Sequence, residues 1–253
     1  MMKKLVFVLC FVTVLISCSK DVINTNGTRL VAIDYQQSNS SISTWKELFE
    51  YETGRITKIE DLYSLGKRYE ITYANNQLQE YSTYIISDNT LAFRDSVAYN
   101  QNGTIRAVYN FITNLGSDAP LLFIDEFEYS DDGKIIAKKN FSTAREIYRS
   151  TRRYFWNENN VVKTEYYNEE GTLFYETSAT YDSKINYKKD IPIYALSPAG
   201  WNANNVTKSA LIDYTGAIDV ACNPCETEYK YNLDDYPVFI ELHDGRQLSL
   251  SYE

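Results

Sequence analysis

The sequence of 253 residues contains one histidine, four cysteines, two methionines, five prolines and ten glycines. Because His243 is the single histidine, any Ser-His-Asp or Cys-His arrangement would have to use it, and it stands beside an Asp-Gly turn. A zinc centre would have to be carboxylate-only or mixed. Few Gly and Pro residues, with 44% hydrophobic residues, are typical of a folded chain rather than a disordered one. The sequence therefore contains few of the residues that catalytic sites commonly use.

Clusters of Lys or Arg are also absent from a chain whose net charge is −9 and whose pI is about 4.8. A nucleic-acid-binding protein needs a basic stripe to replace the counterions on the phosphates, so nucleic acid is excluded as a partner. An acidic surface is also repelled by anionic lipid. Attachment to a membrane would therefore depend on a covalent lipid.

One apolar run stands out, Leu5 to Ile16, directly after Lys3 and Lys4. A positive segment followed by an apolar stretch of this length is typical of a secretory signal peptide. The run is shorter than the roughly 20 apolar residues that span a hydrocarbon core, which disfavours a transmembrane anchor.

The run ends in Leu15-Ile16-Ser17-Cys18, which resembles a bacterial lipobox. This resemblance implies a signal peptide over residues 1–17, a diacylated Cys18 and a tether over residues 18–29. A plain secretion signal with an incidental cysteine is the alternative. Ser19-Lys20-Asp21 resembles the signal that routes Bacteroidetes lipoproteins to the cell surface. We therefore expect a lipid-anchored outer-membrane protein, facing the outside of the cell.

Beyond the signal region, the remaining cysteines are Cys222 and Cys225, in a C-x-x-C motif around Pro224. Such a motif is half of a zinc site, a redox dithiol or a local disulfide. Structural zinc takes four ligands, and His243 is the other soft candidate. In an oxidising compartment the motif predicts a structural disulfide. The redox and metal alternatives remain open.

A repeated pattern runs through the rest of the chain: an aromatic residue, a polar cluster with Gly or Asn, and then a strand of alternating polarity. Copies start at Tyr51, Tyr73, Tyr99, Tyr129, Trp156, Tyr167 and Tyr231. The Asn, Asp and Gly residues supply the positive φ that hairpin turns require. Period-two alternation is typical of antiparallel sheet with one wet face. The sequence predicts an all-β antiparallel meander of hairpins, in one domain over residues 30–253.

The alternation stops between residues 183 and 208, a stretch that carries Pro192, Pro198 and Gly200. We predict a long crossing loop with a short helical turn that covers one end of the sheet. A second loop is expected over residues 38–43.

The Tyr-x-x-x-Gly-[Arg/Lys/Thr]-Ile copies resemble the YD repeats of Rhs and teneurin shell proteins. The C-terminal part is similar to Bacteroidetes lipoproteins of unknown function with a porin-like fold. Four elements carry this similarity: Tyr181-Asp182, Asn204 to Thr207, Tyr236-Pro237 and Asp244-Gly245. The resemblance implies a sheet curled into a closed or nearly closed barrel, and it implies no activity. Short strands, Tyr-rich apolar faces and a mean hydropathy of −0.40 favour a soluble barrel over a membrane-spanning one.

Acidic residues offer the remaining chemistry. Asp125, Glu126 and Glu128 are candidates for the paired carboxylates of a glycosidase, although acids on a wet strand face are usually solvated. The acids at residues 131–132 and 234–235 lack the ligand spacing of a calcium loop. Asp95-Ser96-Val97 resembles the acceptor motif of Bacteroidetes O-glycosylation, which makes Ser96 a candidate modification site.

No catalytic, cofactor-binding or metal-binding residue is assigned from the sequence, and no cofactor is expected. The 23 tyrosines greatly outnumber any catalytic set, and their flat faces and hydroxyl groups suit glycan or peptide binding. We therefore favour a non-enzymatic binding or interaction module. The alternatives are a carboxylate-dependent glycan hydrolase and a structural subunit of an outer-membrane surface complex.

Overall fold

The computed structural model describes residues 29–37, 45–62, 66–112, 121–142, 147–218 and 222–253. These residues form sixteen β-strands, one 3₁₀ turn and one four-residue helix. The strands are β1 (Leu30–Gln37), β2 (Trp45–Glu52), β3 (Arg55–Asp61), β4 (Lys67–Ala74), β5 (Gln77–Ile85), β6 (Thr90–Tyr99), β7 (Ile105–Ile112), β8 (Leu121–Tyr129), β9 (Ile135–Ser142), β10 (Ile147–Asn157), β11 (Asn160–Tyr167), β12 (Leu173–Tyr181), β13 (Val206–Asp213), β14 (Cys225–Tyr231), β15 (Pro237–Leu242) and β16 (Arg246–Tyr252). The predicted loop over residues 38–43 lies outside the described residues.

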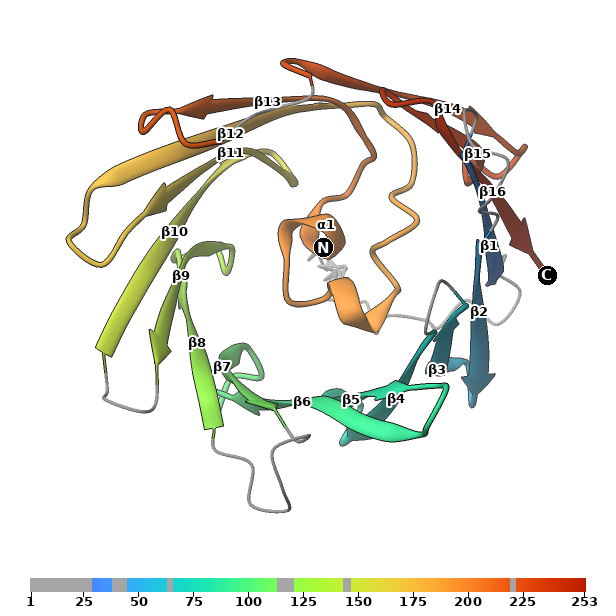
Figure 1. The fold of residues 1–253 in the computed structure, drawn as a ribbon, viewed down its shortest axis with the longest axis horizontal. Coiled ribbons are helices and arrows are strands. Elements are labelled where there is room, and N and C mark those ends of the chain that lie inside the picture. Colours follow the sequence, from blue (N-terminus) through green and yellow to red (C-terminus); the bar gives the residue numbers. More distant parts are fainter. Residues whose placement is uncertain (1–28, 38–44, 63–65, 113–120, 143–146, 219–221) are drawn as a thin grey trace, which may run out of the picture.

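Each strand pairs antiparallel with its neighbours in sequence, and β1 closes the circle by pairing with β16 (Figure 1). The seam is secured by a backbone pair between Arg29 and Glu253, at 2.9 Å in both directions. The predicted all-β antiparallel barrel is confirmed. Closure leaves no exposed sheet edge, which removes the hazard of edge-to-edge pairing with another chain.

The two ends of the barrel differ. At one, here called the turn end, tight turns join β2 to β3, β4 to β5, β6 to β7, β8 to β9 and β10 to β11. The predicted turn residues adopt positive φ there, including Gly54 (83°), Asn76 (67°) and Gly103 (86°). The chain also enters β1 and leaves β16 at this end. The opposite, loop end carries longer connections, such as residues 214–224 between β13 and β14.

A ring of aromatic side chains explains the repeated pattern. On every even-numbered strand, one Tyr or Trp near the turn end donates a hydrogen bond to a carbonyl oxygen on the preceding odd-numbered strand, at 2.5–2.9 Å. The eight donor–acceptor pairs are Tyr51–Leu30, Tyr73–Ile56, Tyr99–Leu78, Tyr129–Ile105, Trp156–Ile135, Tyr181–Val161, Tyr229–Val206 and Tyr252–Pro237. Where the aromatic residue opens a predicted copy, as at Tyr51, Tyr73, Tyr99, Tyr129 and Trp156, its hydrogen bond therefore links its own strand to the preceding strand.

Two of the predicted repeat copies do not supply ring members. Tyr167 precedes a turn at the loop end and donates to Glu165 at 2.7 Å. Tyr231 donates instead to the carboxylate of Asp182. Their sequence signature is that of a turn, which occurs at both ends of the barrel, so the pattern alone does not distinguish the two ends.

Residues 182–205, here called the inner segment, fold inside the ring of strands (Figure 1). The segment contains the 3₁₀ turn η1 (Pro192–Tyr194) and the helix α1 (Pro198–Trp201), both preceded by extended residues and opened by a proline. Proline suits the first helical position because its fixed φ is already helical and the missing N–H has no partner there.

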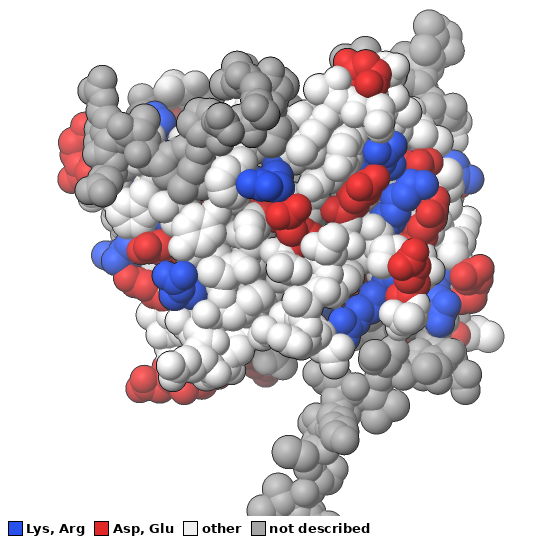
Figure 2. All heavy atoms as spheres, turned by 90° about the horizontal axis from the view of Figure 1, so that it is seen from below, with Lys and Arg blue, Asp and Glu red and all other residues white. Residues whose placement is uncertain are grey.

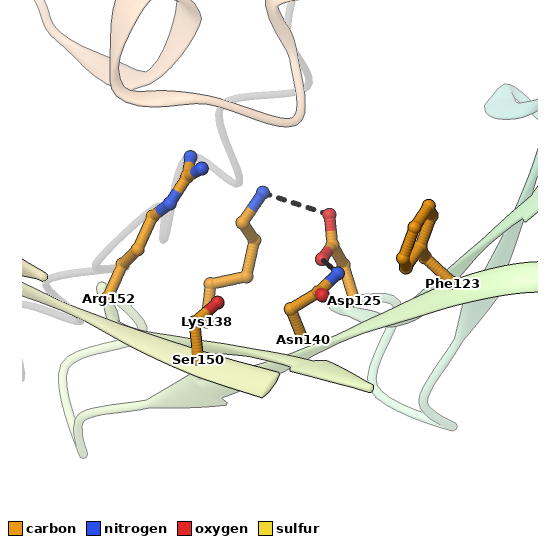
Figure 3. Close-up of a pocket in the computed structure, with 6 residues that line it drawn as sticks. All are labelled: Phe123, Asp125, Lys138, Asn140, Ser150 and Arg152. Atoms are coloured by element: carbon orange, nitrogen blue, oxygen red, sulfur yellow. Dashed lines mark hydrogen bonds and ion pairs between the residues drawn. The ribbon is translucent and has the colours of Figure 1, made fainter. Parts of the chain in front are cut away.

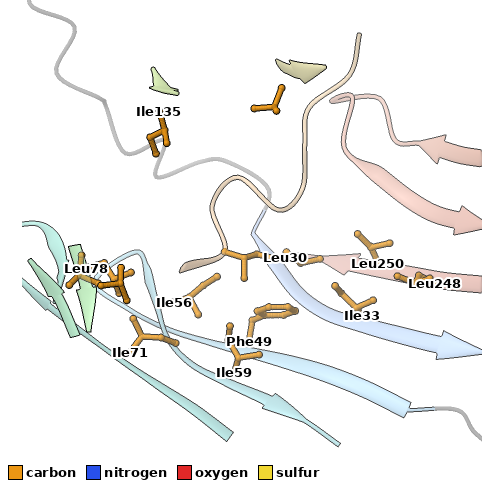
Figure 4. Packing of buried hydrophobic residues seen from close by; sticks show 14 of the residues in the cluster. Leu30, Ile33, Phe49, Ile56, Ile59, Ile71, Leu78, Ile135, Leu248 and Leu250 are labelled. Carbon is orange, nitrogen blue, oxygen red and sulfur yellow. The ribbon is translucent and has the colours of Figure 1, made fainter. Parts of the chain in front are cut away.

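The hydrophobic core lies between the inner segment and the inward faces of the strands (Figure 4). Ile191 of the inner segment is 1% exposed and joins a cluster drawn from most of the strands. Its strand members include Leu30, Ile56, Leu78, Ile135 and Val161. These five residues stand within the first two positions of odd-numbered strands, which start at the turn end. The inner segment therefore fills the turn-end half of the barrel, and beside β1 and β2 its Tyr187 and Tyr194 also reach the neighbourhood of Tyr35, toward the loop end.

Buried amides hold the inner segment in shape. Asn186 donates to the carbonyl oxygens of Ala199 (2.7 Å) and Asn202 (2.9 Å). The side chain of Asn202 accepts from the backbone N–H of Val161 on β11, at 2.7 Å. Gly200 packs so closely that a Cβ atom there would lie 2.4 Å from the Tyr194 carbonyl oxygen. These contacts satisfy backbone groups that would otherwise be buried without partners.

The outer wall is polar along much of its height. Lys58 pairs with Glu50 on the neighbouring strand at 2.6 Å, and Lys163 pairs with Glu165 at 2.6 Å. Figure 2 shows acidic and basic side chains interspersed on one side of this wall rather than segregated by sign. Among the described residues, no helix is long and apolar enough to cross a bilayer.

Candidate functional site

Two adjacent cavities lie inside the barrel toward the loop end, beyond the inner segment. The first, of about 240 Å³, is lined by Phe123, Asp125, Lys138, Asn140, Ser150 and Arg152 (Figure 3). The second, of about 350 Å³, is lined by Lys67, Tyr69, Tyr81, Thr83, Phe93, Asp95, Asn110, Phe111, Ile112 and Phe123. Phe123 lines both cavities, so they adjoin each other on β4 to β10 and are treated as one candidate site.

Strand register explains why these side chains converge. Asp95 on β6 stands opposite both Tyr81 on β5 and Asn110 on β7. Asp125 on β8 stands opposite Asn140 on β9. Directly opposed residues in an antiparallel sheet point to the same face. Asn110 stands opposite Phe123, two residues before Asp125, so both polar groups lie on the inner wall, offset by two residues.

An ion pair fixes the centre of the first cavity. Lys138 Nζ lies 2.9 Å from Asp125 Oδ2, and Asn140 donates to Asp125 Oδ1 at 2.8 Å (Figure 3). Both carboxylate oxygens of Asp125 are therefore engaged. The side chains of this ion pair are only 18% and 14% exposed, so salt screens the pair less than it screens the outer-wall pairs.

Asp95 is a second carboxyl group on the same wall, and its residue is 8% exposed. Burial raises the pKa of Asp95 from 3.8 to about 6, and the negative charge of Asp125 adds to this effect. A hydrogen bond from Tyr81 and the charge of Lys138 act in the opposite direction. Burial and the neighbouring Asp95 also raise the pKa of Tyr81. Asp95 thus changes its charge near pH 6 while facing the second cavity.

Arg152 completes the first cavity. Its guanidinium group stands 5.1 Å from the centre of the Tyr166 ring, which in turn stacks on Tyr175 at 3.9 Å. Arg152 is exposed although it points into the barrel (Figure 3). The cavity is therefore open to solvent at this point.

The three carboxylates that the sequence offers as glycosidase candidates lie on opposite faces of strand β8. Asp125 lines the cavity, whereas Glu126 and Glu128 are exposed, and Glu128 pairs with Lys139 of the neighbouring strand. Adjacent residues on a strand point to opposite faces, so Asp125 and Glu126 cannot act together. An acid that lines the neighbouring cavity, on the same inner wall as Asp125, is Asp95. In the sequence, Asp95 was noted only as the first residue of the predicted O-glycosylation motif. The acceptor of that motif, Ser96, is half-buried in the middle of β6.

Cys222 and Cys225 are joined by a disulfide at the loop end, with their Cα atoms 5.1 Å apart. The turn after β15 brings His243 to the same place, so that its ring and the two sulfur atoms lie within 4.8 Å of one another. This group offers three ligands, one fewer than a structural zinc site requires, and its sulfur atoms are bonded to each other. Cys18 lies outside the described residues.

The acidic turns serve local structure. Asp132 accepts from Ser130 and pairs with Lys134 in the turn after β8. Asp235 pairs with Lys184 and so links the turn after β14 to the start of the inner segment. The contacts of Asp132 are those of a hairpin turn, as the sequence indicates, whereas Asp235 makes a long-range contact.

The fold and the site define a closed, sixteen-stranded antiparallel barrel with an internal plug at one end and a polar, aromatic-lined cavity at the other. The chain is similar to a porin-like protein from Bacteroides vulgatus, with a TM-score of 0.55 and 12% sequence identity over 90% of this chain and 99% of that one. A porin-like protein from Bacteroides uniformis matches with a TM-score of 0.39 and 14% identity, over 88% of this chain and 96% of that one. No family model and no curated protein matches the sequence. The expected similarity to porin-like proteins of this group is confirmed at the level of the fold.

Sequence reasoning did not bring Tyr81, Asp95, Lys138 and Arg152 together. The alternation in each strand indicates that these residues share a face with buried neighbours such as Val97 and Tyr154. Finding the cavity also requires knowing that the inner segment fills the turn-end half and leaves the loop-end half open. No local pattern contains that information.

Proposed function

We propose that this protein is a lipid-anchored binding protein of the cell envelope that holds a saccharide in the loop-end cavity. The observation that carries the proposal is the open interior beside β4 to β10: the inner segment fills the turn-end half of the barrel, and aromatic rings and polar groups line the cavities toward the loop end of these strands. A barrel serving as a scaffold alone would gain stability from packing side chains into this space.

The lining favours a saccharide. Phe93, Phe123 and Tyr69 offer flat apolar faces, and Asp125, Asn140 and Asn110 offer planar acceptors and donors for hydroxyl groups. The second cavity, of about 350 Å³, falls within the roughly 300–1,000 Å³ that is typical of small-molecule sites, and the first, of about 240 Å³, lies just below this range. Both cavities are open rather than enclosed, so one unit of a longer chain fits as well as a free sugar.

The start of β1 and the cavity lie at opposite ends of the barrel. The lipobox at Cys18 precedes β1, which starts at the turn end, and the cavity lies toward the loop end. A lipid on Cys18 would therefore place the plugged end toward the membrane and the cavity away from it. Charged pairs on the outer wall, such as Lys58 with Glu50, support a barrel that stands outside the bilayer, because a spanning barrel carries an apolar band there. The likeness to porin-like proteins of Bacteroides supports an envelope location.

The binding test is a glycan array probed with the full-length lipoprotein in detergent. We expect a defined set of glycans to bind, and Phe123→Ala to reduce their affinity about tenfold, because an aromatic platform contributes about 1–2 kcal/mol. Phe155→Ala is the matched control, since Phe155 is an exposed phenylalanine of β10 that packs against Lys163 on the outer wall. Absence of any glycan binding, or equal losses in the two variants, would refute a saccharide site in the cavity.

The anchoring test is metabolic labelling with a fatty acid. The native protein should incorporate the label and remain with the outer membrane, and Cys18→Ala should release it. Protease added to intact cells should digest the native protein if the Ser19-Lys20-Asp21 signal directs it to the surface. A labelled Cys18→Ala variant would contradict the lipid assignment.

A carboxylate-dependent glycan hydrolase is the second candidate, and Asp95 with Asp125 is the observation that favours it. The two acids face one interior, and β6 and β8 are two strand spacings apart, so their Cα atoms lie roughly 10–12 Å from each other. Carboxyl groups about 6.5–9.5 Å apart are typical of inverting glycosidases. Asp95, with its pKa raised to about 6, would be the general acid, and Asp125 the base.

This candidate predicts turnover of a glycan that the array identifies. Asp95→Asn and Asp125→Asn should each abolish product formation while Glu126→Gln, on the outer wall, leaves it intact. Binding without turnover in the native protein would leave the binding function and exclude the hydrolase for that glycan.

A further inference from the structure

The charges in the first cavity do not cancel. Lys138 is committed to Asp125 at 2.9 Å, and Asn140 occupies the other oxygen of that carboxylate. Arg152 lines the same cavity, yet within the described residues no carboxylate lies at ion-pair distance from it. One positive charge is therefore left over, pointing into the barrel (Figure 3).

Aromatic rings hold this charge in place. The guanidinium group of Arg152 lies over Tyr166, and the stack of Tyr166 on Tyr175 supports that ring from behind. Nearby, the guanidinium group of Arg149 stands 5.7 Å from the centre of Phe123, the ring that joins the two cavities. Stacking on one face leaves the N–H edge of a guanidinium free to donate, and it limits the rotamers that binding must freeze.

The groups on the surrounding strands leave this edge available. On β9, Lys138 faces the cavity and is neutralised by Asp125 of β8. On β11, Glu165 is directed to Lys163 and Tyr167 on the outer wall. Toward the second cavity, Lys67 adds a positive charge at the rim and Asp95 adds a carboxyl group, so the uncompensated positive charge is that of Arg152 in the first cavity. The Tyr154 hydroxyl group lies within hydrogen-bonding reach of Arg152, but it is neutral, so a ligand carboxylate would supply the opposite charge that Arg152 lacks.

We propose that the loop-end cavity selects acidic saccharides, and that Arg152 binds the carboxylate of a uronic-acid unit. This inference rests on the proposed saccharide-binding function and names its ligand class. A guanidinium group presents parallel N–H donors that match the two oxygens of a carboxylate. The aromatic and amide groups of the cavity then contact the sugar ring and its hydroxyl groups.

The experiment compares matched ligands on the full-length lipoprotein. Each uronic-acid oligosaccharide is paired with its carboxyl-reduced, neutral counterpart, and sulfated analogues are included. The native protein should bind the acidic member about tenfold to a hundredfold more tightly, because a hydrogen-bonded charge contributes about 1.5–3 kcal/mol. Arg152→Gln should abolish this preference, so that the acidic member binds no more tightly than the neutral one.

Arg153→Gln is the matched control. Arg153 neighbours Arg152 in β10 and also lies over a tyrosine, Tyr167 at 4.9 Å, but on the outer wall. The preference should survive in this variant. Equal affinity for acidic and neutral members, preference for sulfated analogues alone, or loss of preference in Arg153→Gln would overturn the assignment of Arg152 while saccharide binding stands. Failure of every saccharide to bind would overturn the proposed function and the inference together.

Discussion

Eight Tyr and Trp side chains form a circle of hydrogen bonds at the turn end of the barrel. Removing the hydroxyl group of one of these tyrosines tests whether the hydrogen bonds stabilise the barrel. Tyr99→Phe deletes the donor that reaches the Leu78 carbonyl oxygen at 2.7 Å and keeps the ring that packs on the core. Leu78 is 8% exposed, so water replaces the lost donor poorly. An unpaired buried acceptor costs about 1–3 kcal/mol. We expect the free energy of unfolding to fall by about 1–2 kcal/mol.

Urea unfolding, followed by tryptophan fluorescence, measures this change. For a chain of this size the loss corresponds to a fall in Tm of roughly 2–8 °C. The denaturant dependence of the unfolding free energy should be unchanged, because the same surface is exposed on unfolding. Tyr167→Phe is the control: this hydroxyl group bonds Glu165 on the outer wall, and its loss should cost at most about 0.5 kcal/mol.

A second ring substitution extends the test. Tyr252 on β16 donates to Pro237 at 2.8 Å, and β16 lies six strand spacings from β6, about 29 Å along the sheet. Because the two sites share no partner, the losses in the double variant should add to within about 0.5 kcal/mol. If Tyr99→Phe costs no more than Tyr167→Phe, the ring hydroxyl groups do not stabilise the barrel, and the repeated aromatic residue contributes through packing alone.

The remaining predictions concern the interior and the loop end. Burial raises the pKa of Asp95 to about 6, so the folded barrel binds more protons than the unfolded chain between about pH 4 and 6. The free energy of unfolding should therefore fall by up to about 3 kcal/mol as pH rises through this range. Asp95→Asn should flatten the plot of unfolding free energy against pH. Gly200→Ala places a Cβ atom 2.4 Å from the Tyr194 carbonyl oxygen, and we expect a loss of about 1–3 kcal/mol or more in urea unfolding, with weaker saccharide binding where the inner segment shifts. Replacing Cys222 and Cys225 together by Ser opens a four-residue loop, which should cost about 2 kcal/mol in thermal unfolding and leave saccharide affinity unchanged.

A specific outcome would contradict each of these three predictions. A stability curve that keeps its slope in Asp95→Asn would show that another group titrates. An unaffected Gly200→Ala variant would show that the inner segment yields without cost. A change of saccharide affinity in the double Cys variant would show that the disulfide positions the cavity rather than a loop.

Most of the fold could be predicted from the repeated hairpin pattern in the sequence. Strand positions, the antiparallel pairing and the positive φ at Gly54 and Asn76 follow from alternation and turn chemistry, which act over a few residues. The interruption over residues 183–208 was also visible as a break in the alternation. The sequence did not show which aromatic residues form the ring, because Tyr167 and Tyr99 precede similar Asn-x-x-Gly turns at opposite ends of the barrel.

The candidate site followed less from the sequence. Asp125 was a candidate carboxylate, but its neighbours in sequence, Glu126 and Glu128, point outward, and its interior partner Asp95 lies thirty residues away. Such a pair is created by strand register and by barrel closure. Neither is encoded in a short motif.

The sequence by itself determined a hairpin meander, because period-two polarity and turn residues are local properties of the chain. Tertiary structure decided that β1 meets β16 and that the inner segment folds into the turn-end half. It also decided that Lys138 is neutralised and Arg152 is not. These outcomes depend on contacts between residues far apart in the chain, which only the closed barrel brings together.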